Sequence, residues 1–376
     1  MEVIVVGGGP AGAIAARTLA EAGIRTFLIE RDLSRVKPCG GGIPSTAFKE
    51  FKISEDVIER KITKIGAVSP GLKEITIPLK GGYLAMVRRE VFDAYLRKEA
   101  ERAGAELIEG LFLNLRIGSR IGIEYREKGI TKRLSADFLI GADGTNSSVA
   151  SAIGLKHPER FLAILERIRV SSEQMDYYRD RCEFWYGSEI SSCLYGWVFP
   201  KGDHLCIGTA VDFRDSKRLP LHLEKFKEKL GKRIDGFSVI RREASPGPVE
   251  VAHRKVHGKI LLCGDAAGLV MPVSAEGIYY AMKSGEMAAE EIMKSKNPGD
   301  LNGYEERWNR LYEKRFDFMK RLHEIFYLDD TMREKLVEIH RIKAIQKASM
   351  ALWLKKDLSS RMLTAYKLLF ETYVKI

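Results

Sequence analysis

The sequence contains few side-chain amides. Glutamine occurs at positions 174 and 346 and asparagine at five positions, whereas lysine and arginine together number 62 and the acidic residues 51. Few amides combined with many charged side chains are typical of proteins from hot environments, where ion-pair networks are favoured and amides are labile. The composition therefore predicts a thermophilic source.

Long apolar runs are also missing. No stretch reaches the roughly 18 uncharged apolar residues that a membrane-spanning helix needs, so no such helix is expected. The first apolar run begins at Val3 and meets Gly7 without a basic leader or a small-residue cleavage site before it. A secretory signal is therefore not expected either.

Cysteine is scarce, with five residues at positions 39, 182, 193, 206 and 263. They form no C-x-x-C pair and no zinc-type spacing with histidine, so we expect no metal site and a reduced, intracellular protein. One disulfide bond remains possible from the sequence. Cys182 and Cys193 lie equally far from Gly187-Ser188 and would face each other if those two residues turned a hairpin.

The hydrophobic content and the net charge indicate a folded protein with an excess of basic residues. A hydrophobic content of 45% excludes a disordered or fibrous protein, and 376 residues exceed what one hydrophobic core usually serves. The net charge of +11 allows two interpretations: a solvated surface rich in ion pairs, or attraction to phosphates and anionic lipid headgroups.

The first 30 residues form a predicted βαβ unit. A β-branched strand over 2–6 leads into Gly7-Gly8-Gly9-Pro10-Ala11-Gly12, an Ala-rich helix over 13–22 follows, and a second strand covers 25–30. Later segments are predicted as follows: a loop over 37–44, a helix over 89–103, strands over 107–115, 121–125, 136–140 and 259–263, a helix over 277–294, and helices from 301 onward.

Residues from about 160 to 250 differ in character from the rest. Strands rich in aromatic and β-branched residues are predicted over 163–170, 181–186, 192–199 and 204–211, with a turn at 200–203, which indicates an antiparallel sheet. Pieces of nucleotide-binding type lie before and after this sheet, so the sheet is interpreted as an insertion into a nucleotide-binding domain.

The motif Gly7-x-Gly9-x-x-Gly12, with Glu30 eighteen residues after Gly12, predicts dinucleotide binding. Its glycines allow a tight turn, backbone approach to a pyrophosphate and close helix–strand packing, and the helix N-terminus attracts phosphate. Glu30 would accept hydrogen bonds from ribose hydroxyls and disfavours a 2′-phosphate. The alternative is a purely structural glycine turn.

Two strand–Gly–Asp loops, Gly141-Ala142-Asp143-Gly144 and Gly264-Asp265-Ala266-Ala267-Gly268, complete a resemblance. With the N-terminal motif they resemble the FAD-dependent monooxygenase and reductase superfamily typified by p-hydroxybenzoate hydroxylase. The resemblance implies FAD, held by Asp265 and by the helix N-terminus at Gly277 and Ile278, with Arg89 near the pyrophosphate. Asp143 alone would be an ordinary turn aspartate and Arg89 alone a surface charge.

Two further segments narrow the resemblance. Lys37-Pro38-Cys39-Gly40-Gly41-Gly42-Ile43-Pro44 resembles the KPCGG-type loop of geranylgeranyl reductases, and Tyr195-x-Trp197-x-Phe199-Pro200-Lys201 resembles their YxWxFP segment. The similarity covers roughly residues 1–300. It implies an enzyme that saturates double bonds of geranylgeranyl chains, carried by archaeal diether phospholipids, by diphosphate or by the chlorophyll side chain.

The implied fold is α/β (α+β overall): a Rossmann-type FAD-binding domain split by an antiparallel-sheet substrate domain, with a C-terminal helical segment. We expect the FAD domain over 1–155 and 253–300, the substrate sheet over 156–252 with some strands near 62–88 joining it, and the helical region over 301–376. The predicted cofactor contacts are Gly7, Gly9, Ala11, Gly12, Glu30, Arg31, Cys39, Gly40, Gly42, Arg89, Asp143, Asp265, Gly277 and Ile278.

Tyr195, Trp197 and Phe199 alternate along a predicted strand and so share one face. With the family resemblance this face is interpreted as the wall of an apolar tunnel for the isoprenoid, the alternative being ordinary core packing. Cys39 is the candidate catalytic residue, as a flavin contact or a proton donor. The alternative is a small side chain that suits a tight backbone contact.

The expected reaction moves a hydride from reduced flavin to the alkene and a proton from a group not identified by the sequence. No second dinucleotide motif is present, so the external electron donor is open among ferredoxin, a deazaflavin and NAD(P)H. Nucleic acid is not expected as a partner. A cytoplasmic protein, peripheral on the inner face of the membrane, is expected, and its C-terminal aromatic residues suit either an interface or helix packing: Trp308, Phe316, Phe318, Phe326 and Trp353.

Two other classes remain open. A flavin-dependent hydroxylase or halogenase would share the FAD motifs, although the WxWxIP segment expected of a halogenase is not found. A non-catalytic, membrane-associated flavoprotein is the third.

Overall fold

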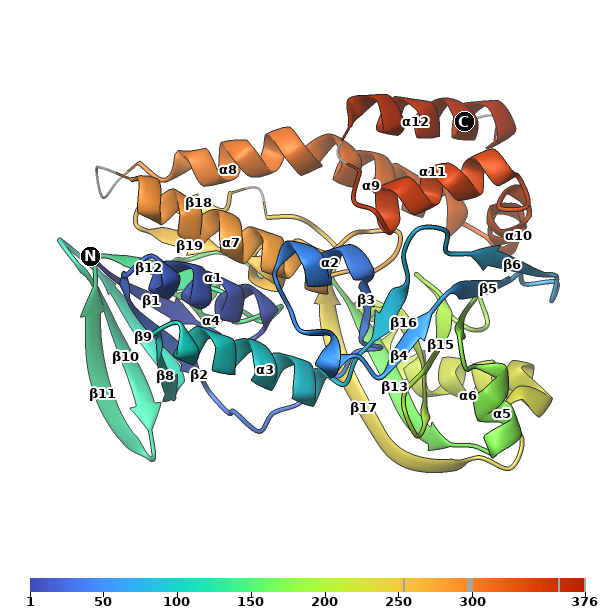
Figure 1. The fold of residues 1–376 in the computed structure, drawn as a ribbon, viewed down its shortest axis with the longest axis horizontal. Helices are drawn as coiled ribbons and strands as arrows, with labels where there is room; N and C mark the ends of the chain where they lie inside the picture. The colour runs from blue at the N-terminus through green and yellow to red at the C-terminus, as the bar shows by residue number, and fades with distance from the viewer. Residues whose placement is uncertain (253, 296–299, 358, 375–376) are drawn as a thin grey trace. The chain divides into compact units, whose positions relative to one another are not determined.

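The computed structural model describes residues 1–252, 254–295, 300–357 and 359–374 (Figure 1). Residues 253 and 296–299 of the expected second part of the FAD domain, and residues 358, 375 and 376 of the expected helical region, lie outside the described residues. The chain divides into two compact units. Unit 1 comprises 1–36, 90–160 and 247–316, and unit 2 comprises 37–89, 161–246 and 317–376.

This division differs from the expected one. Residues 37–89 belong with the antiparallel sheet and not with the nucleotide-binding fold, and so does most of the C-terminal helical region. The separation was not visible in the sequence, because unit 2 is assembled from three segments that long stretches of unit 1 keep apart along the chain.

Unit 1 is built on a six-stranded sheet in the order β18-β19-β12-β1-β2-β8, parallel except for the edge pair β18–β19. The strands are β1 (Glu2–Val6), β2 (Arg25–Glu30), β8 (Glu106–Glu109), β12 (Phe138–Gly141), β18 (Val256–His257) and β19 (Ile260–Leu262). Its helices are α1 (Pro10–Glu21), α3 (Arg89–Arg102), α4 (Ser148–Ala152), α7 (Ile278–Lys294) and α8 (Asn302–Trp308). Helix α1 lies beside α7 and against β1 and β2 (Figure 1).

Two boundaries in unit 1 differ from the predictions. Helix α1 begins at Pro10, three residues early, because proline is well accommodated in the first helical turn, where its missing N–H would have no partner. The single strand predicted over 107–115 is two strands, β8 and β9 (Leu111–Ile117), separated at Gly110. Strands β10 (Ile121–Glu127) and β11 (Ile130–Ala136) complete a small antiparallel sheet with β9, and β11 was not predicted.

Unit 2 contains a seven-stranded sheet in the order β17-β13-β16-β15-β14-β5-β6. Its strands are β5 (Lys64–Val68), β6 (Glu74–Pro78), β13 (Arg160–Arg169), β14 (Arg181–Trp185), β15 (Gly196–Pro200), β16 (Leu205–Asp212) and β17 (Ser238–Pro248). β14 pairs with β5 in parallel, and the other pairs of this sheet with a defined register are antiparallel, as expected.

A separate three-stranded sheet joins β3 (Gly42–Pro44), β7 (Leu84–Met86) and β4 (Arg60–Ile62) in the order β3-β7-β4. One expectation is corrected here: the loop predicted over 37–44 ends in a strand, because Gly42–Pro44 pair with Leu84–Met86. The expectation that some strands near 62–88 join the large sheet is confirmed by β5 and β6, whereas β7 lies in the small sheet.

The helices of unit 2 are α2 (Ser45–Glu50), α5 (Ser172–Tyr177), α6 (Leu219–Leu230), α9 (Lys314–Phe326), α10 (Asp330–Ile339), α11 (Lys343–Trp353) and α12 (Ser360–Val374). Val337 of α10 and Leu354 after α11 pack into one core cluster with Ile65 and Ile77 of the large sheet. No helix among the described residues is both long and apolar enough to cross a membrane.

The C-terminal aromatic residues form packing contacts and not an interfacial surface. Trp308 and Phe326 are 1% and 0% exposed, Phe316 and Phe318 are also buried, and Trp353 packs against a core cluster. The mixture of aromatic and basic residues suggested an interface because sequence alone does not show which side of a helix faces the core.

Cys182 and Cys193 do not form a disulfide, since both thiols are free. The register pairs Trp185 with Gly196, so the connection between β14 and β15 is much longer than a two-residue turn at Gly187-Ser188. Cys193 lies inside that connection, before β15 begins.

Candidate functional site

Two of the three motif glycines are required by the packing of unit 1. A Cβ on Gly7, whose φ is +105°, would lie 2.3 Å from the carbonyl oxygen of Ala142. A Cβ on Gly12 would lie 1.8 Å from the carbonyl oxygen of Gly7. Any side chain at either position would displace the turn between β1 and α1.

Gly9 is different, because a Cβ there would meet nothing within 4 Å. Gly9 is the N-cap of α1, and no side chain among the described residues caps this helix. The open space and the unmatched N–H groups of the first turn form a cradle of the kind that a pyrophosphate occupies. The residues present therefore fit a bound dinucleotide.

Glu30 ends β2 and lies at this cradle. Its carboxylate accepts a hydrogen bond of 2.6 Å from the N–H of Gly8, which leaves acceptor capacity for a ribose hydroxyl. Arg31, the next residue, is exposed.

Arg97 is a further residue at this cradle that was not expected from the sequence. This arginine of α3 is 7% exposed and donates to the carbonyl oxygens of Gly8, at 3.3 Å, and Leu33, at 3.0 Å. Arg89, Asp93 and Arg97 are all buried and are spaced by four residues along α3, a pattern of charge at helical spacing that would have pointed to them. Burial of Arg89 excludes its interpretation as a surface charge.

Asp143 is engaged in local structure. Its carboxylate accepts hydrogen bonds from the Ser147 hydroxyl at 2.5 Å and from the N–H groups of Ser148 and Val149 at 2.7 and 3.1 Å. Burial raises the pKa of Asp143, and these hydrogen bonds act in the opposite direction. The carboxylate thus orders the start of α4, a role that needs no ligand.

Asp265 lies in the turn after β19, where its carboxylate accepts a hydrogen bond of 3.3 Å from the hydroxyl of Thr145. Gly277 is the N-cap of α7 and Ile278 its first residue, and no side chain among the described residues caps this helix. A Cβ on Gly277 would lie 3.5 Å from the Asp265 carboxylate, so the aspartate and the helix N-terminus are adjacent. Ala11 contacts α7 instead, through the close approach of its carbonyl to Gly285.

In unit 2 the loop of Cys39, Gly40 and Gly41 is held by backbone contacts. Gly41 has a φ of +67°, and a Cβ there would lie 2.3 Å from the carbonyl oxygen of Val87. The N–H of Gly41 donates to the Cys39 sulfur at 3.3 Å, and its carbonyl accepts from the N–H of Val87 at 2.9 Å. Cys39 itself is half-buried.

The same loop packs on the predicted aromatic face. A Cβ on Gly40 would lie 2.7 Å from the ring of Phe199 and 3.3 Å from Nε1 of Trp197, so the loop backbone rests directly on both rings. A Cβ on Gly42 would lie 3.1 Å from Phe199. Tyr195, just before β15, continues the face, with its ring centroid 6.3 Å from that of Trp197.

One further feature of this face was not predicted. Trp197 is 9% exposed, and no acceptor among the described residues lies within hydrogen-bond reach of its indole N–H. A buried donor without an acceptor is costly, and this one lies beside Gly40.

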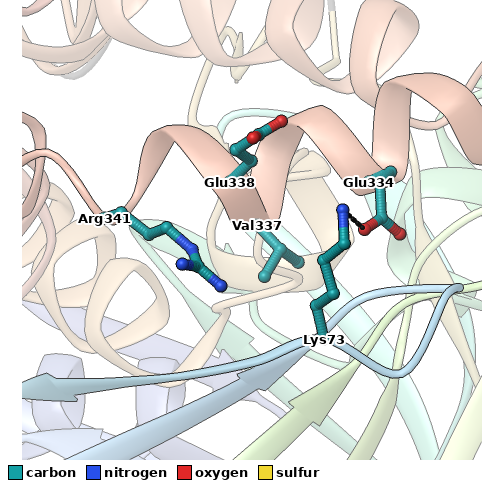
Figure 2. A pocket seen from close by; sticks show the side chains of 5 residues that line it. All are labelled: Lys73, Glu334, Val337, Glu338 and Arg341. Atoms are coloured by element: carbon teal, nitrogen blue, oxygen red, sulfur yellow. Dashed lines mark ion pairs between the residues drawn. The ribbon is translucent and has the colours of Figure 1, made fainter.

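Unit 2 also contains a cavity of about 140 Å³ beside α10 (Figure 2). It is lined by Lys73, Glu334, Val337, Glu338 and Arg341, and Lys73 forms an ion pair of 3.2 Å with Glu334. No predicted site residue lines it.

The fold and the cradle of unit 1 define a flavoprotein of the FAD-dependent oxidoreductase class. The family described as "FAD binding domain" matches residues 1–296, so the cofactor is FAD. The chain is 40% identical to geranylgeranyl diphosphate reductase of Arabidopsis thaliana over 95% of this chain and 80% of that protein. It is 32% identical to digeranylgeranylglycerophospholipid reductase of Methanocaldococcus jannaschii, over 85% and 84% of the two chains.

The chain belongs to the geranylgeranyl reductase family. Its fold is also that of a geranylgeranyl bacteriochlorophyll reductase-like protein from Thermoplasma acidophilum, with a TM-score of 0.84 at 23% identity over 100% of this chain and 98% of the other.

Proposed function

We propose that this protein is an FAD-dependent reductase that saturates carbon–carbon double bonds of geranylgeranyl chains, carried on diphosphate or on an ether-linked phospholipid. Membership of the geranylgeranyl reductase family supports the reaction class. The observation that carries the proposal is the packing of Gly40 directly on Trp197 and Phe199, because it brings the candidate proton donor Cys39 next to an apolar aromatic face.

Saturating an alkene adds a hydride to one carbon and a proton to the other. FAD, once reduced by an external donor, supplies the hydride. We assign the proton to Cys39: its S–H bond breaks, the proton goes to the alkene carbon, and the electron pair stays on sulfur until solvent returns a proton. Because Cys39 is half-buried, its sulfur can contact both the alkene carbon that takes the proton and the solvent that returns one.

The aromatic face of Tyr195, Trp197 and Phe199 has the role of orienting the isoprenoid and excluding water. An isolated alkene is unactivated, so positioning of the reacting atoms and a dry site must supply much of the rate. Phe184 extends this face, because its ring centroid lies 4.9 Å from that of Tyr195 and 5.5 Å from that of Phe199.

Three further properties belong to the proposal. The electron donor is ferredoxin, a deazaflavin or NAD(P)H, and the protein works in the cytoplasm on the inner face of the membrane as a peripheral protein. The net charge of +11 supports attraction to anionic headgroups. The scarcity of amides supports a thermophilic archaeal source, for which we expect an unfolding midpoint above the range of about 45–65 °C usual for mesophilic domains.

The direct test uses product mass. The purified FAD-loaded protein is reduced with dithionite without oxygen and given either geranylgeranyl diphosphate or digeranylgeranylglycerophospholipid. A gain of about two mass units per double bond is expected for at least one substrate, and no gain with either would refute the proposal. A gain of about sixteen units in the presence of oxygen would identify a hydroxylase instead.

Two variants test the assignment of the proton. Cys39→Ser is expected to lower the rate by a factor of about 10² or more, in the range attributed to general acid catalysis. Cys193→Ser is the matched control, because Cys193 is a second half-buried cysteine of unit 2 and lies outside the proposed site. Equal rates for the two variants would remove Cys39 from the mechanism.

A further inference from the structure

Lys201 is an unusual residue of unit 2, because it carries its ammonium group in the interior. It follows β15 directly and is 3% exposed. Its Nζ donates to the carbonyl oxygen of Gly40 at 2.7 Å and to that of Val87 at 2.9 Å. The lysine therefore joins the Cys39 loop to the end of β7 and to the turn after β15.

No carboxylate among the described residues lies within ion-pair distance of Lys201. The titratable and charged groups that face it are Cys39 of the loop, Cys206 of β16, Glu59 before β4 and Arg167 of β13, while Arg60 donates to its backbone carbonyl. Glu59 is already paired with Arg88 and accepts the N–H of Gly202 at 3.1 Å. Arg167 is paired with Glu243 at 3.1 Å.

The sulfurs of Cys39 and Cys206 remain as groups that could carry a negative charge opposite the Lys201 ammonium. Burial raises the pKa of the Cys206 thiol to about 11, so that group stays neutral. Burial also lowers the pKa of Lys201, while Cys206, Cys39 and Glu59 oppose that change. An apolar side chain would occupy this interior position at a smaller desolvation cost, so the ammonium has a use there.

Cys39 is the group whose negative charge the Lys201 ammonium could balance. The N–H of Gly41 already donates to it at 3.3 Å, and Lys201 binds the carbonyl of the intervening residue, Gly40. The indole N–H of Trp197, which has no acceptor among the described residues, lies against the same Gly40. One of these donors, the Gly41 N–H, binds the sulfur itself, and the other two lie at the neighbouring residue Gly40. The half-buried sulfur is the only acidic group of residues 39–41. Such surroundings stabilise a thiolate.

We infer that Lys201 is a positioning residue for Cys39: its ammonium fixes the Cys39 loop and stabilises the negative charge that the sulfur carries after giving up its proton. This inference rests on the proposed role of Cys39 as proton donor. It adds a residue that acts on the reaction through Cys39 and its loop.

The test measures the rate at which iodoacetamide alkylates Cys39 in the FAD-loaded protein as a function of pH, read by mass spectrometry of the Cys39 peptide. Lys201→Gln keeps N–H donors for the two carbonyls and removes the charge, whereas Lys201→Arg keeps the charge. We expect K201Q to alkylate Cys39 about tenfold more slowly at pH 7 and K201R to remain within about threefold of the unmodified protein.

Lys255→Gln is the matched control. Lys255 is also 3% exposed, and its Nζ donates to Asn309 at 3.1 Å within unit 1. It should destabilise the protein comparably without changing the Cys39 profile. A K201Q profile equal to that of the unmodified protein would overturn the inference, because the lysine would then act through its hydrogen bonds alone.

A second measurement needs no variant. A peptide with the sequence of residues 35–45 contains Cys39 and its neighbouring basic residues but not Lys201. At pH 7 Cys39 should be alkylated faster in the protein than in the peptide, and an equal or slower rate would overturn the inference. Neither measurement uses a prenyl substrate, so each stands or fails separately from the mass test of the proposed function.

Discussion

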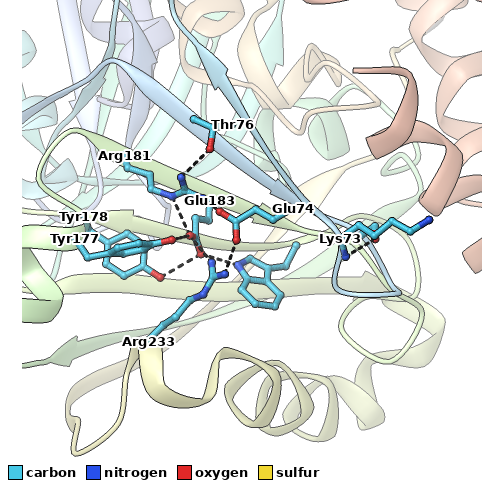
Figure 3. A network of polar contacts seen from close by, with 10 residues as sticks. Lys73, Glu74, Thr76, Tyr177, Tyr178, Arg181, Glu183 and Arg233 are labelled. Atoms are coloured by element: carbon cyan, nitrogen blue, oxygen red, sulfur yellow. Dashed lines mark hydrogen bonds and ion pairs between the residues drawn. The ribbon is translucent and has the colours of Figure 1, made fainter. Parts of the chain in front are cut away.

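Unit 2 buries two ionic centres that differ in how completely they are partnered. Glu183 of β14 is 0% exposed and lies at the centre of a polar cluster (Figure 3). Its carboxylate accepts hydrogen bonds from Arg181 at 3.0 Å, Arg233 at 2.5 Å, Trp185 at 2.8 Å, Tyr177 at 3.0 Å and Tyr178 at 3.1 Å. Glu74 pairs with both arginines and so balances the second positive charge.

Lys201 has two carbonyl oxygens and no carboxylate among the described residues. The charges of the Glu183 cluster are balanced within the protein, whereas the charge of Lys201 is balanced only when something else nearby becomes negative. A buried charge whose opposite charges and hydrogen-bond partners are all present stabilises the fold. A buried charge without an opposite charge can instead stabilise charge that develops during a reaction. The difference between them is testable by four further changes.

The largest effect is expected for Glu183→Gln. The change keeps the shape of the side chain but leaves two arginines facing a neutral group, so we expect a loss of about 3–5 kcal/mol in the free energy of unfolding. Denaturant titration measures it. Glu334→Gln is the control, because Glu334 pairs with the exposed Lys73 and should contribute less than about 1 kcal/mol (Figure 2). Equal losses would contradict the structural role of the Glu183 cluster.

The N-terminus of α1 also lacks partners, but there the groups without side-chain acceptors among the described residues are backbone N–H groups. Gly9→Ala meets no atom within 4 Å, so the unfolding midpoint of the FAD-free protein should stay unchanged. If the cradle holds the pyrophosphate, the added methyl group intrudes on it and FAD affinity should fall about tenfold, or about 1.4 kcal/mol. Fluorescence titration with FAD measures this, and unchanged affinity would move the pyrophosphate elsewhere.

Trp197→Phe removes the unmatched indole N–H and keeps most of the aromatic surface. Because the donor has no protein acceptor in the described part of the chain, stability should change by less than about 0.5 kcal/mol. The value of kcat/KM for prenyl reduction should fall several-fold, up to about tenfold, since the face proposed to orient the isoprenoid loses part of its surface. Lower stability with unchanged kcat/KM would place Trp197 with the structural residues.

The smallest effect concerns His340, a half-buried group that is held neutral. Its Nδ1–H donates to the Leu336 carbonyl at 2.8 Å, and burial lowers the pKa of His340 below its ordinary value. Below about pH 6.5 the His340 side chain binds a proton in the unfolded chain but stays neutral in the folded chain. The free energy of unfolding should therefore fall with decreasing pH, by up to about 1.4 kcal/mol per pH unit. Denaturant titrations at several pH values measure the slope, and His340→Gln should flatten it.

The parts of the site that the sequence predicted well are contiguous in the chain. Gly7, Gly12 and Glu30 lie within one βαβ unit, so local strand and helix signals were enough to place the turn and the acid. The loop at Cys39 and the aromatic strand were found through resemblance. Their contact, Gly40 against Phe199, could not be read from either segment alone.

The residues that were missed are charged or polar side chains whose partners are not adjacent along the chain. Arg97 lies 89 residues from Gly8, whose carbonyl it binds, and nothing in the sequence near Gly8 indicates it. Tyr177, Tyr178 and Arg233 were likewise unnoticed, because a buried ionic cluster has no sequence motif. The disulfide between Cys182 and Cys193 was considered for the opposite reason: symmetry along the chain suggested a register that the strands do not adopt.

Sequence alone was sufficient for the cofactor class and the family, since a glycine motif and short loops that resemble those of a known family carry their chemistry in neighbouring residues. The place of Lys201 depended on folding. Its identity is visible beside Phe199-Pro200, but its two acceptors come from residues 161 and 114 positions away. Whether a lysine faces water or the interior is determined by which distant backbone closes over it, and that information is contained only in the packed chain.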